Sequence, residues 1–192
     1  NGVFSKLRAF GTTTDTYVYE KNILTAAKMI HYVYSNSDRL SGSDMETILS
    51  VSENEINEMW NHASSSKTLA AAHWSNIYNA ASLWTKIRNV SGGELVTGSL
   101  SEDKVETLLR VEHARWNMEQ LLLGFRPVTK ADLNKDIWRS EVCRELKRRM
   151  VHVDIRSFES LEKEDFDSIY YDRILTEAIP LINGYLEKTV CR

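Results

Sequence analysis

The chain has 192 residues, of which 42% are hydrophobic and 27% are charged, so it can bury a core as one large domain or as two closely packed halves. The formal net charge of −3 leaves no excess of Lys and Arg for phosphate contacts, which argues against a general nucleic-acid-binding protein. The sequence contains no apolar run near the roughly twenty residues of a membrane span and no recognisable signal peptide.

The cysteines indicate the cellular compartment of the protein, and the first residues indicate how the chain continues upstream. Cys143 and Cys191 make neither a disulfide framework nor a metal-ligand set, so we expect reduced thiols in a cytoplasmic protein. The chain begins with Asn1 rather than Met, and residues 1–20 are rich in Thr, Tyr and Phe. We interpret residues 1–20 as a segment, able to form a short strand, that joins the chain to an upstream domain.

Periodic apolar residues predict a series of helices in the N-terminal half. Spacings of three and four, together with two capping-box patterns, predict helices over residues 22–34, 44–50, 53–62 and 69–87. The sequence Val90-Ser-Gly-Gly then interrupts the helical pattern. We therefore place the internal boundary of the chain at that point.

The most informative helix is predicted over residues 101–123. Ser101 can cap its start, and Gly124 can end it in the left-handed conformation. Three polar residues interrupt its apolar stripe: Glu112, His113 and Arg115. Polar groups beside buried aromatic residues must be paired or must meet a ligand. This helix is thus predicted to form both part of the core and the edge of a site.

The remaining C-terminal residues predict further helices and one extended segment. A polar connector leads up to Asp136, and helices are predicted over residues 136–149, 158–165 and 168–186. Alternation of apolar and polar residues predicts a short extended segment over residues 151–155. Pro180 lies inside the last predicted helix, so we expect a kink or a new helix start there.

The two halves of the chain share a pattern. Each contains a His with an aromatic residue three positions later, then a further aromatic residue and a long predicted helix. These residues are His31, Tyr34 and Trp60 in the first half and His113, Trp116 and Phe158 in the second. Helical units that cannot bury their apolar faces alone pack against each other. We predict a mainly α-helical tandem of two such units, residues 21–90 and 99–190, about a pseudo-two-fold axis with few short strands.

Three ordered motifs in the second half carry a resemblance to a known family. They are Glu112-His-Ala-Arg-Trp116 with Gly124-Phe-Arg126, then Arg148 to Ile155 with Phe158-Glu-Ser-Leu161, then Asp172-Arg173 with Ile179-Pro180. In these motifs the chain resembles the RyR domain family, first named in ryanodine receptor channels, and especially its bacterial members. The first half resembles the more divergent preceding repeat of that family.

The resemblance implies a regulatory module without an established catalytic role. Some ryanodine receptor repeats are implicated in adenine-nucleotide binding. Bacterial members often follow a Rossmann-type NAD-binding domain of the TrkA-N kind, so other domains of the same polypeptide are the implied partners. The chain departs from the family where Lys, Pro and Tyr are common, at Gln120, Val153 and Pro127. Loss of that Lys puts a phosphate contact in doubt.

The polar residues of the 101–123 helix leave two interpretations open. In the first, a guanidinium grips an anion and an indole stacks on a base, so a small nucleotide-like anion binds between the halves. The expected ligand-binding residues are Tyr34, His113, Arg115, Trp116, Arg126 and Arg149. In the second, Glu112, Arg115 and Glu119 form an ion-pair row at offsets of three and four, and His113 is a core residue bonded to a backbone carbonyl.

Other functional classes find less support in the sequence. The basic run Lys147-Arg-Arg149 is typical of a solvated helix end, and Ser140 after Arg139 is a very weak phosphorylation signal. The histidines show no metal-ligand spacing, and no glycine-rich phosphate loop occurs, so we expect neither metal nor cofactor. Glu112 and Glu119 could act as an acid/base pair, but Arg115 between them favours charge pairing over catalysis.

We therefore expect a non-catalytic, ligand-sensing module of a larger cytoplasmic protein. The alternative is a purely structural docking domain, in which the aromatic residues form the core and a partner-facing patch and no small ligand binds.

Overall fold

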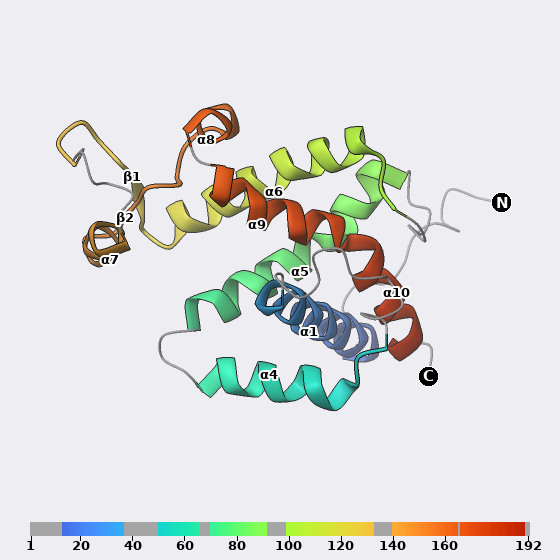
Figure 1. Cartoon of the computed structure of the whole chain (residues 1–192). Helices are drawn as coiled ribbons and strands as arrows, with labels where there is room; N and C mark the ends of the chain where they lie inside the picture. Colours follow the sequence, from blue (N-terminus) through green and yellow to red (C-terminus); the bar gives the residue numbers. More distant parts are fainter. Residues whose placement is uncertain are drawn as a thin grey trace.

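The computed structural model describes residues 13–36, 50–65, 70–91, 99–132, 140–164 and 166–190, and these residues are mainly α-helical, as the sequence predicts (Figure 1). In chain order the elements are α1 (Thr13–Ser35), α4 (Glu53–Ser65), α5 (Ala70–Ser91), α6 (Glu102–Leu122), β1 (Arg126–Pro127), α7 (Ser140–Arg148), β2 (Val151–His152), α8 (Phe158–Glu164), α9 (Phe166–Glu177) and α10 (Ile179–Val190). No helix among these residues is both long and apolar enough to cross a membrane.

The predicted helices 53–62, 69–87, 101–123 and 158–165 are confirmed as α4, α5, α6 and α8. The short strand expected within residues 1–20 is wrong for residues 13–20, because α1 begins at Thr13, and the connection to an upstream domain stays a prediction. Thr and Asp at its start are residues that favour helix N-termini. Residues 1–12 and the predicted helix over residues 44–50 lie outside the described part, apart from Ser50.

Proline determines where the last long helical stretch is divided. The sequence predicts a new start or a kink at Pro180, and the structure shows α9 ending at Glu177 and α10 beginning at Ile179. Proline fits the first turn of a helix, where its missing N–H costs no intrahelical bond. The chain therefore changes from α9 to α10 without leaving the helical body (Figure 1).

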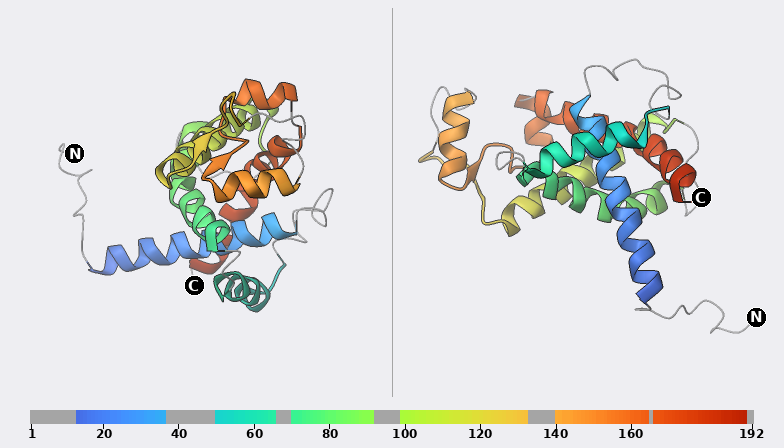
Figure 2. Two further views of the ribbon diagram at one scale, coloured as in Figure 1. Left: turned by 90° about the vertical axis from the view of Figure 1, so that its left-hand side faces the viewer. Right: turned by 90° about the horizontal axis from the view of Figure 1, so that it is seen from below.

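A small lobe made of β1, β2 and α7 lies to one side of the helical body (Figures 1 and 2). Gly124 has φ +91 and turns the chain out of α6 in the left-handed conformation that the sequence predicts. Arg126 and Pro127 then pair in parallel with Val151 and His152. The extended segment at residues 151–155 is thus confirmed at its first residues, whereas its partner strand was not predicted. The helix predicted over residues 136–149 is confirmed as α7 from Ser140, and residues 133–139 lie outside the described part.

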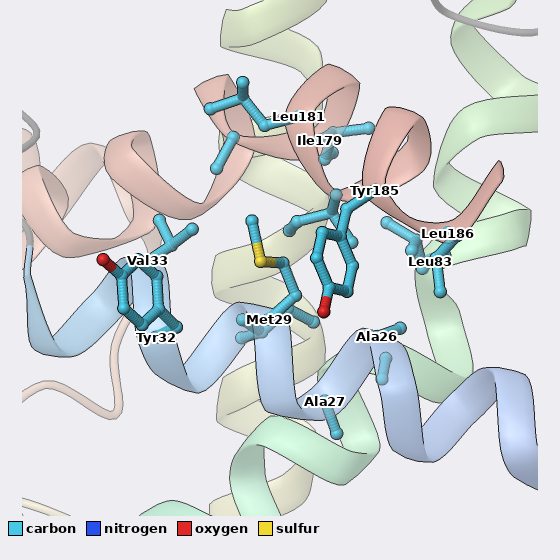
Figure 3. Packing of buried hydrophobic residues seen from close by; sticks show 14 of the residues in the cluster. Ala26, Ala27, Met29, Tyr32, Val33, Leu83, Ile179, Leu181, Tyr185 and Leu186 are labelled. Atoms are coloured by element: carbon cyan, nitrogen blue, oxygen red, sulfur yellow. The ribbon is translucent and has the colours of Figure 1, made fainter. Parts of the chain in front are cut away.

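The main hydrophobic core surrounds α1. Buried side chains of α1 pack against α4, α5 and α10, and Figure 3 shows Met29 pointing between α1 and α10 beside Tyr185. Met29 is fully buried, at 0% exposure. The first turns of α1 extend past the rest of the helices (Figure 2). Ala26 and Ala27 form a buried small-residue surface on α1, which lets neighbouring helices approach it closely.

Helix α6 joins the main core to a second one. Leu108 belongs to the core around α1, while Val105 and Leu109 pack with Phe158 and Leu161 of α8. Helix α6 also contacts α5 and α9. It begins after Ser101, as predicted, although the Ser101 hydroxyl makes no capping hydrogen bond. The helix that the sequence singles out therefore lies where the two halves meet.

The residues matched between the halves make similar contacts. The rings of His31 and Trp60 meet edge to face with centroids 5.9 Å apart, and those of His113 and Phe158 do so at 6.0 Å. The Nδ1 atom of each His also faces a polar side chain of the next long helix, Asn76 in the first half and Asp172 in the second. The two halves thus share these contacts, and the tandem repeat about a pseudo-two-fold axis stays a prediction.

Replacing Met29 with Ala tests the main core. We expect Met29→Ala to lower the free energy of unfolding by about 2–5 kcal/mol, because a buried side chain is lost and a cavity remains. Leu24→Ala on the same helix is the control, since Leu24 is 42% exposed, and it should change stability by about 0.5 kcal/mol or less. Urea unfolding followed by circular dichroism measures both. Equal losses in the two variants would contradict this core.

Candidate functional site

A cavity of about 480 Å³ lies where the two halves of the chain meet. Residues of α1 and α5 line it from the N-terminal half, and residues of α6, α7, α8, α9 and the β2 segment line it from the C-terminal half. Its wall combines aromatic rings with amide, carboxylate and cationic groups. A cavity of this size and mixture is typical of a small-molecule site.

The structure brings together four of the six predicted ligand-binding residues. Tyr34, His113, Arg115 and Trp116 all line this cavity. Arg126 and Arg149 do not line it, and the prediction that they help there is not supported by their position. The reason lies in the β1–β2 pairing, which places both guanidinium groups beside the buried carboxylate of Asp132.

Asp132 holds the lobe together. Its carboxylate accepts hydrogen bonds from Arg126 at 2.6 and 3.0 Å and from Arg149 at 3.3 Å. The Thr129 backbone N–H and hydroxyl also donate to it, at 3.0 and 2.7 Å. The hydrogen bonds from Arg126 and Thr129 hold the pKa of Asp132 well below its usual range. Arg126 and Arg149 thus have a structural role in the lobe.

Aromatic side chains from both halves line the cavity. Trp116 and His152 meet edge to face with ring centroids 4.8 Å apart. Tyr34 of α1 and Tyr171 of α9 form a second pair at 5.2 Å, and these two side chains are 39% and 44% exposed. Partly exposed rings in a concave wall offer flat apolar surfaces to a planar ligand.

A buried carboxylate, that of Glu112, joins α5 to α6. It forms an ion pair with Lys86 of α5, and both side chains are 4% exposed. Asn79 donates to Glu112 at 2.9 Å and accepts from Lys86 at 2.8 Å. Burial alone would raise the pKa of Glu112, but the charges of Lys86 and Arg115 and the hydrogen bonds of Arg115 lower it. Glu112 is therefore a fixed, ionised link between the two halves.

Arg115 bridges two carboxylates on its own helix. It donates to Glu112 at 3.0 and 2.8 Å and to Glu119 at 2.7 Å. Ser75 of α5 also donates to Glu119, at 3.2 Å. Burial alone would lower the pKa of Arg115, but the hydrogen bonds and charges of Glu112 and Glu119 raise it. The ion-pair row foreseen from the sequence is confirmed, and the carboxylates of Glu112 and Glu119 are held as partners of Arg115.

His113 is held at both ring nitrogens. Its Nδ1 lies 3.4 Å from the Asp172 carboxylate, and its Nε2 lies 2.8 Å from the Arg156 carbonyl oxygen. Burial lowers the pKa of His113, but the hydrogen bonds to Asp172 and the Arg156 carbonyl outweigh it and raise the pKa. The contact with a backbone carbonyl is the one that the second interpretation of the sequence predicts. The second interpretation is thus confirmed for this contact, whereas ligand binding by His113, which also lines the cavity, stays a prediction.

Several residues of the site were not foreseen as such from the sequence. Lys86, Asn79 and Asn76 interrupt the buried face of α5 as polar residues, and that interruption was the available signal. Asp172 and His152 occurred only within family-like motifs, and Tyr171 had no distinguishing pattern. Within the described residues, no group of three His, Cys, Asp or Glu side chains could hold a metal ion.

The chain has no significant match among known family models, curated proteins or solved structures. The arguments below therefore depend on the geometry of the cavity and on the motifs of the sequence.

Removing Lys86 tests the buried ion-pair cluster. We expect Lys86→Met to lower the free energy of unfolding by about 3 kcal/mol, because Glu112 loses its ammonium partner in a dry site. The double change Lys86→Met with Glu112→Leu should be less destabilised than the single one, since no unpaired charge is left there. Arg148→Met is the control, because that ion pair is exposed, and it should cost about 0.5 kcal/mol or less. A double variant worse than the single one would contradict the cluster.

The pH dependence of stability tests the burial of His152. Burial, helped by the charge of Lys147, lowers the pKa of His152 from 6.5 to about 4. Below about pH 6.5 the unfolded chain binds a proton here that the folded chain does not, so folding weakens as the pH falls. His152→Asn should reduce the stability lost between pH 7 and pH 5 by about 2 kcal/mol, as measured by urea unfolding. An unchanged pH dependence would show that His152 is not buried in this way.

Proposed function

We propose that this chain is a non-catalytic, ligand-sensing module of the RyR-domain type, which binds a nucleotide-like small molecule in the cavity between its halves. The observation that carries the proposal is that Tyr34 and Trp116, from opposite halves, line one cavity. These two residues occupy matching positions after His31 and His113 in the sequence. The proposal extends the family resemblance of the motifs to a specific place in the fold.

The walls of the cavity suit a molecule with a planar ring. An indole and two phenol rings provide flat surfaces for stacking, and each stacked base contributes about 1–3 kcal/mol where such contacts have been removed by substitution. Asn76 and Gln120 add amide groups to the lining, which can hydrogen-bond to the edge of a ring. Lys147 adds a cation from α7. A nucleotide-like molecule combines the ring, the polar edge and the anion that these groups fit.

The polar residues of the cavity wall are bonded to other protein groups, which favours sensing over catalysis. A general base needs a nitrogen or carboxylate within reach of the substrate, whereas both nitrogens of His113 face protein groups. Both oxygens of the Glu112 carboxylate already interact with protein groups, namely Lys86, Asn79 and Arg115. These residues position other side chains around the cavity.

Binding at this place would change how firmly the two halves hold together. A ligand that contacts helices of both halves binds best when they are packed as in this structure, so it shifts the population toward that arrangement. Other domains of the same polypeptide, with an NAD-binding Rossmann domain as the implied partner, could respond to that shift. The module would thus report the ligand concentration to other domains through a change in how its two halves pack, without a chemical step.

A docking function is the alternative, and one observation favours it. Helix α6 exposes Met118 at 57% and Leu122 at 81%, and α5 exposes Trp74 at 54% next to Tyr78 at 44%. Large exposed apolar side chains are typical of surfaces that contact other proteins. In this alternative the cavity stays without a small ligand and these exposed side chains carry the function.

A thermal-shift screen with matched tryptophan variants tests the proposal. ATP, ADP, cyclic mono- and dinucleotides, NAD and free nucleosides are added to the parent chain. We expect at least one to raise the unfolding midpoint by about 5 °C at saturation, because a ligand that binds only the folded form stabilises it. Trp116→Leu should abolish the shift, and Trp74→Leu should keep it, since Trp74 does not line the cavity. No shift across the whole panel would favour docking.

A further inference from the structure

We infer that the end of the ligand that enters this cavity is uncharged and accepts hydrogen bonds, and that any phosphate group stays at the mouth beside Lys147. The inference rests on the proposed function and specifies the class of ligand. It also reverses the sequence-based expectation that Arg115 grips an anion.

The hydrogen bonds of Arg115 determine what it can offer to a ligand. Its Nε–H and one N–H each of Nη1 and Nη2 donate to Glu112 and Glu119. The guanidinium carries further N–H groups on Nη1 and Nη2, for which the described residues supply no acceptor. Because its side chain is 15% exposed and lines the cavity, these outer N–H groups are placed to donate to a ligand. Arg115 thus offers donors while its charge is already compensated.

The charges around Arg115 cancel. The ammonium of Lys86 and the guanidinium of Arg115 face the carboxylates of Glu112 and Glu119, so two cations meet two anions. A phosphate placed against Arg115 would lose its hydration and gain no net positive charge in return. A ring carbonyl or ring nitrogen loses far less hydration and can accept the same N–H groups. The inner part of the cavity therefore favours an uncharged group.

Two further acidic residues on the cavity wall also disfavour an anion in the inner part of the cavity. Asp154 and Asp172 line the cavity together with Glu112. His113 faces Asp172, and the His152 ring lies 3.7 Å from Asp154. Negative groups close to a bound phosphate would repel it, and this repulsion is strong where water is excluded. Acidic groups on the wall thus exclude anions from the interior.

Lys147 marks where an anion could bind. It lies in the last turn of α7, its side chain is exposed, and it forms no ion pair with a described residue. A phosphate beside Lys147 would keep part of its hydration at the opening of the cavity. The ligand would then lie with its ring inward, against Trp116, and with its anionic end outward.

Matched nucleosides and monophosphates test this orientation. Guanosine with GMP, uridine with UMP and adenosine with AMP are titrated into the parent chain by calorimetry, together with inorganic phosphate and pyrophosphate. In the parent, the preferred nucleoside should bind within about threefold of its monophosphate, because a screened contact with Lys147 adds little. Inorganic phosphate and pyrophosphate should show no binding.

A change of charge at Glu119 makes the test sharper. Glu119→Gln keeps the shape of the side chain and leaves the guanidinium of Arg115 one charge in excess. The affinity of the monophosphate relative to its nucleoside should therefore rise by about tenfold. Glu106→Gln is the matched control on the same helix, because Glu106 pairs with Arg110 at an exposed position, and it should leave the ratio unchanged.

Two results would overturn the inference while leaving the proposed function intact. The first is a parent chain that binds the monophosphate at least tenfold more tightly than the nucleoside, with a ratio that Glu119→Gln does not change. The second is inorganic phosphate that binds the parent and is lost in Arg115→Ala. The second result does not involve Glu119→Gln, so it decides the matter even if that variant does not fold. No binding of any ring compound would instead overturn the proposed function, and the inference with it.

Discussion

The buried carboxylate of Glu112 is the constraint on which the site depends. A charge at this depth is tolerated only when its lone pairs are matched, and Lys86, Asn79 and Arg115 match them from two helices. An ion pair of this kind adds little net stability, since desolvation opposes the attraction. It does penalise any other alignment of α5 against α6, because a shift would leave charges buried and unpaired. The relative position of the two halves is fixed in this way.

The cavity follows from that alignment. Polar side chains of α5 and α6, among them Asn79, Glu112 and Arg115, line the cavity, whereas Leu83 and Leu108 of the same two helices are almost fully buried in the apolar core. The Tyr34–Tyr171 pair and Trp116 then surround the space that remains. Residues that hold the two halves in register, Glu112 and Arg115, are thus also part of the cavity wall.

Local patterns in the sequence predicted the helices well and the site only in part. Helix α6 was predictable because its apolar spacing, Ser101 and Gly124 all lie within one stretch, and the Glu112–Arg115–Glu119 row follows from helical spacing alone. The β1–β2 pairing was not predictable, because Arg126–Pro127 has no strand pattern and pairs with Val151–His152 only in the folded chain. The roles of Lys86 and Asp172 could not be predicted from the sequence for the same reason. Nothing in the spacing of residues relates them to Glu112 or His113, which they meet from other helices.

The corresponding contacts of the two halves explain why a site should form at their junction. His31 and His113 each hold an aromatic ring on one side and a polar group of the next long helix on the other. Three positions beyond each His, the helix presents Tyr34 or Trp116 to the shared cavity. A duplicated unit that carried an aromatic residue at this position would bring two rings together wherever its copies packed face to face. The two halves differ at the cavity, with Tyr34 from the first and Trp116 from the second, and its acidic side chains, Glu112, Asp154 and Asp172, all come from the second half. An asymmetric ligand with an apolar ring and a polar tail fits such a cavity in one orientation only.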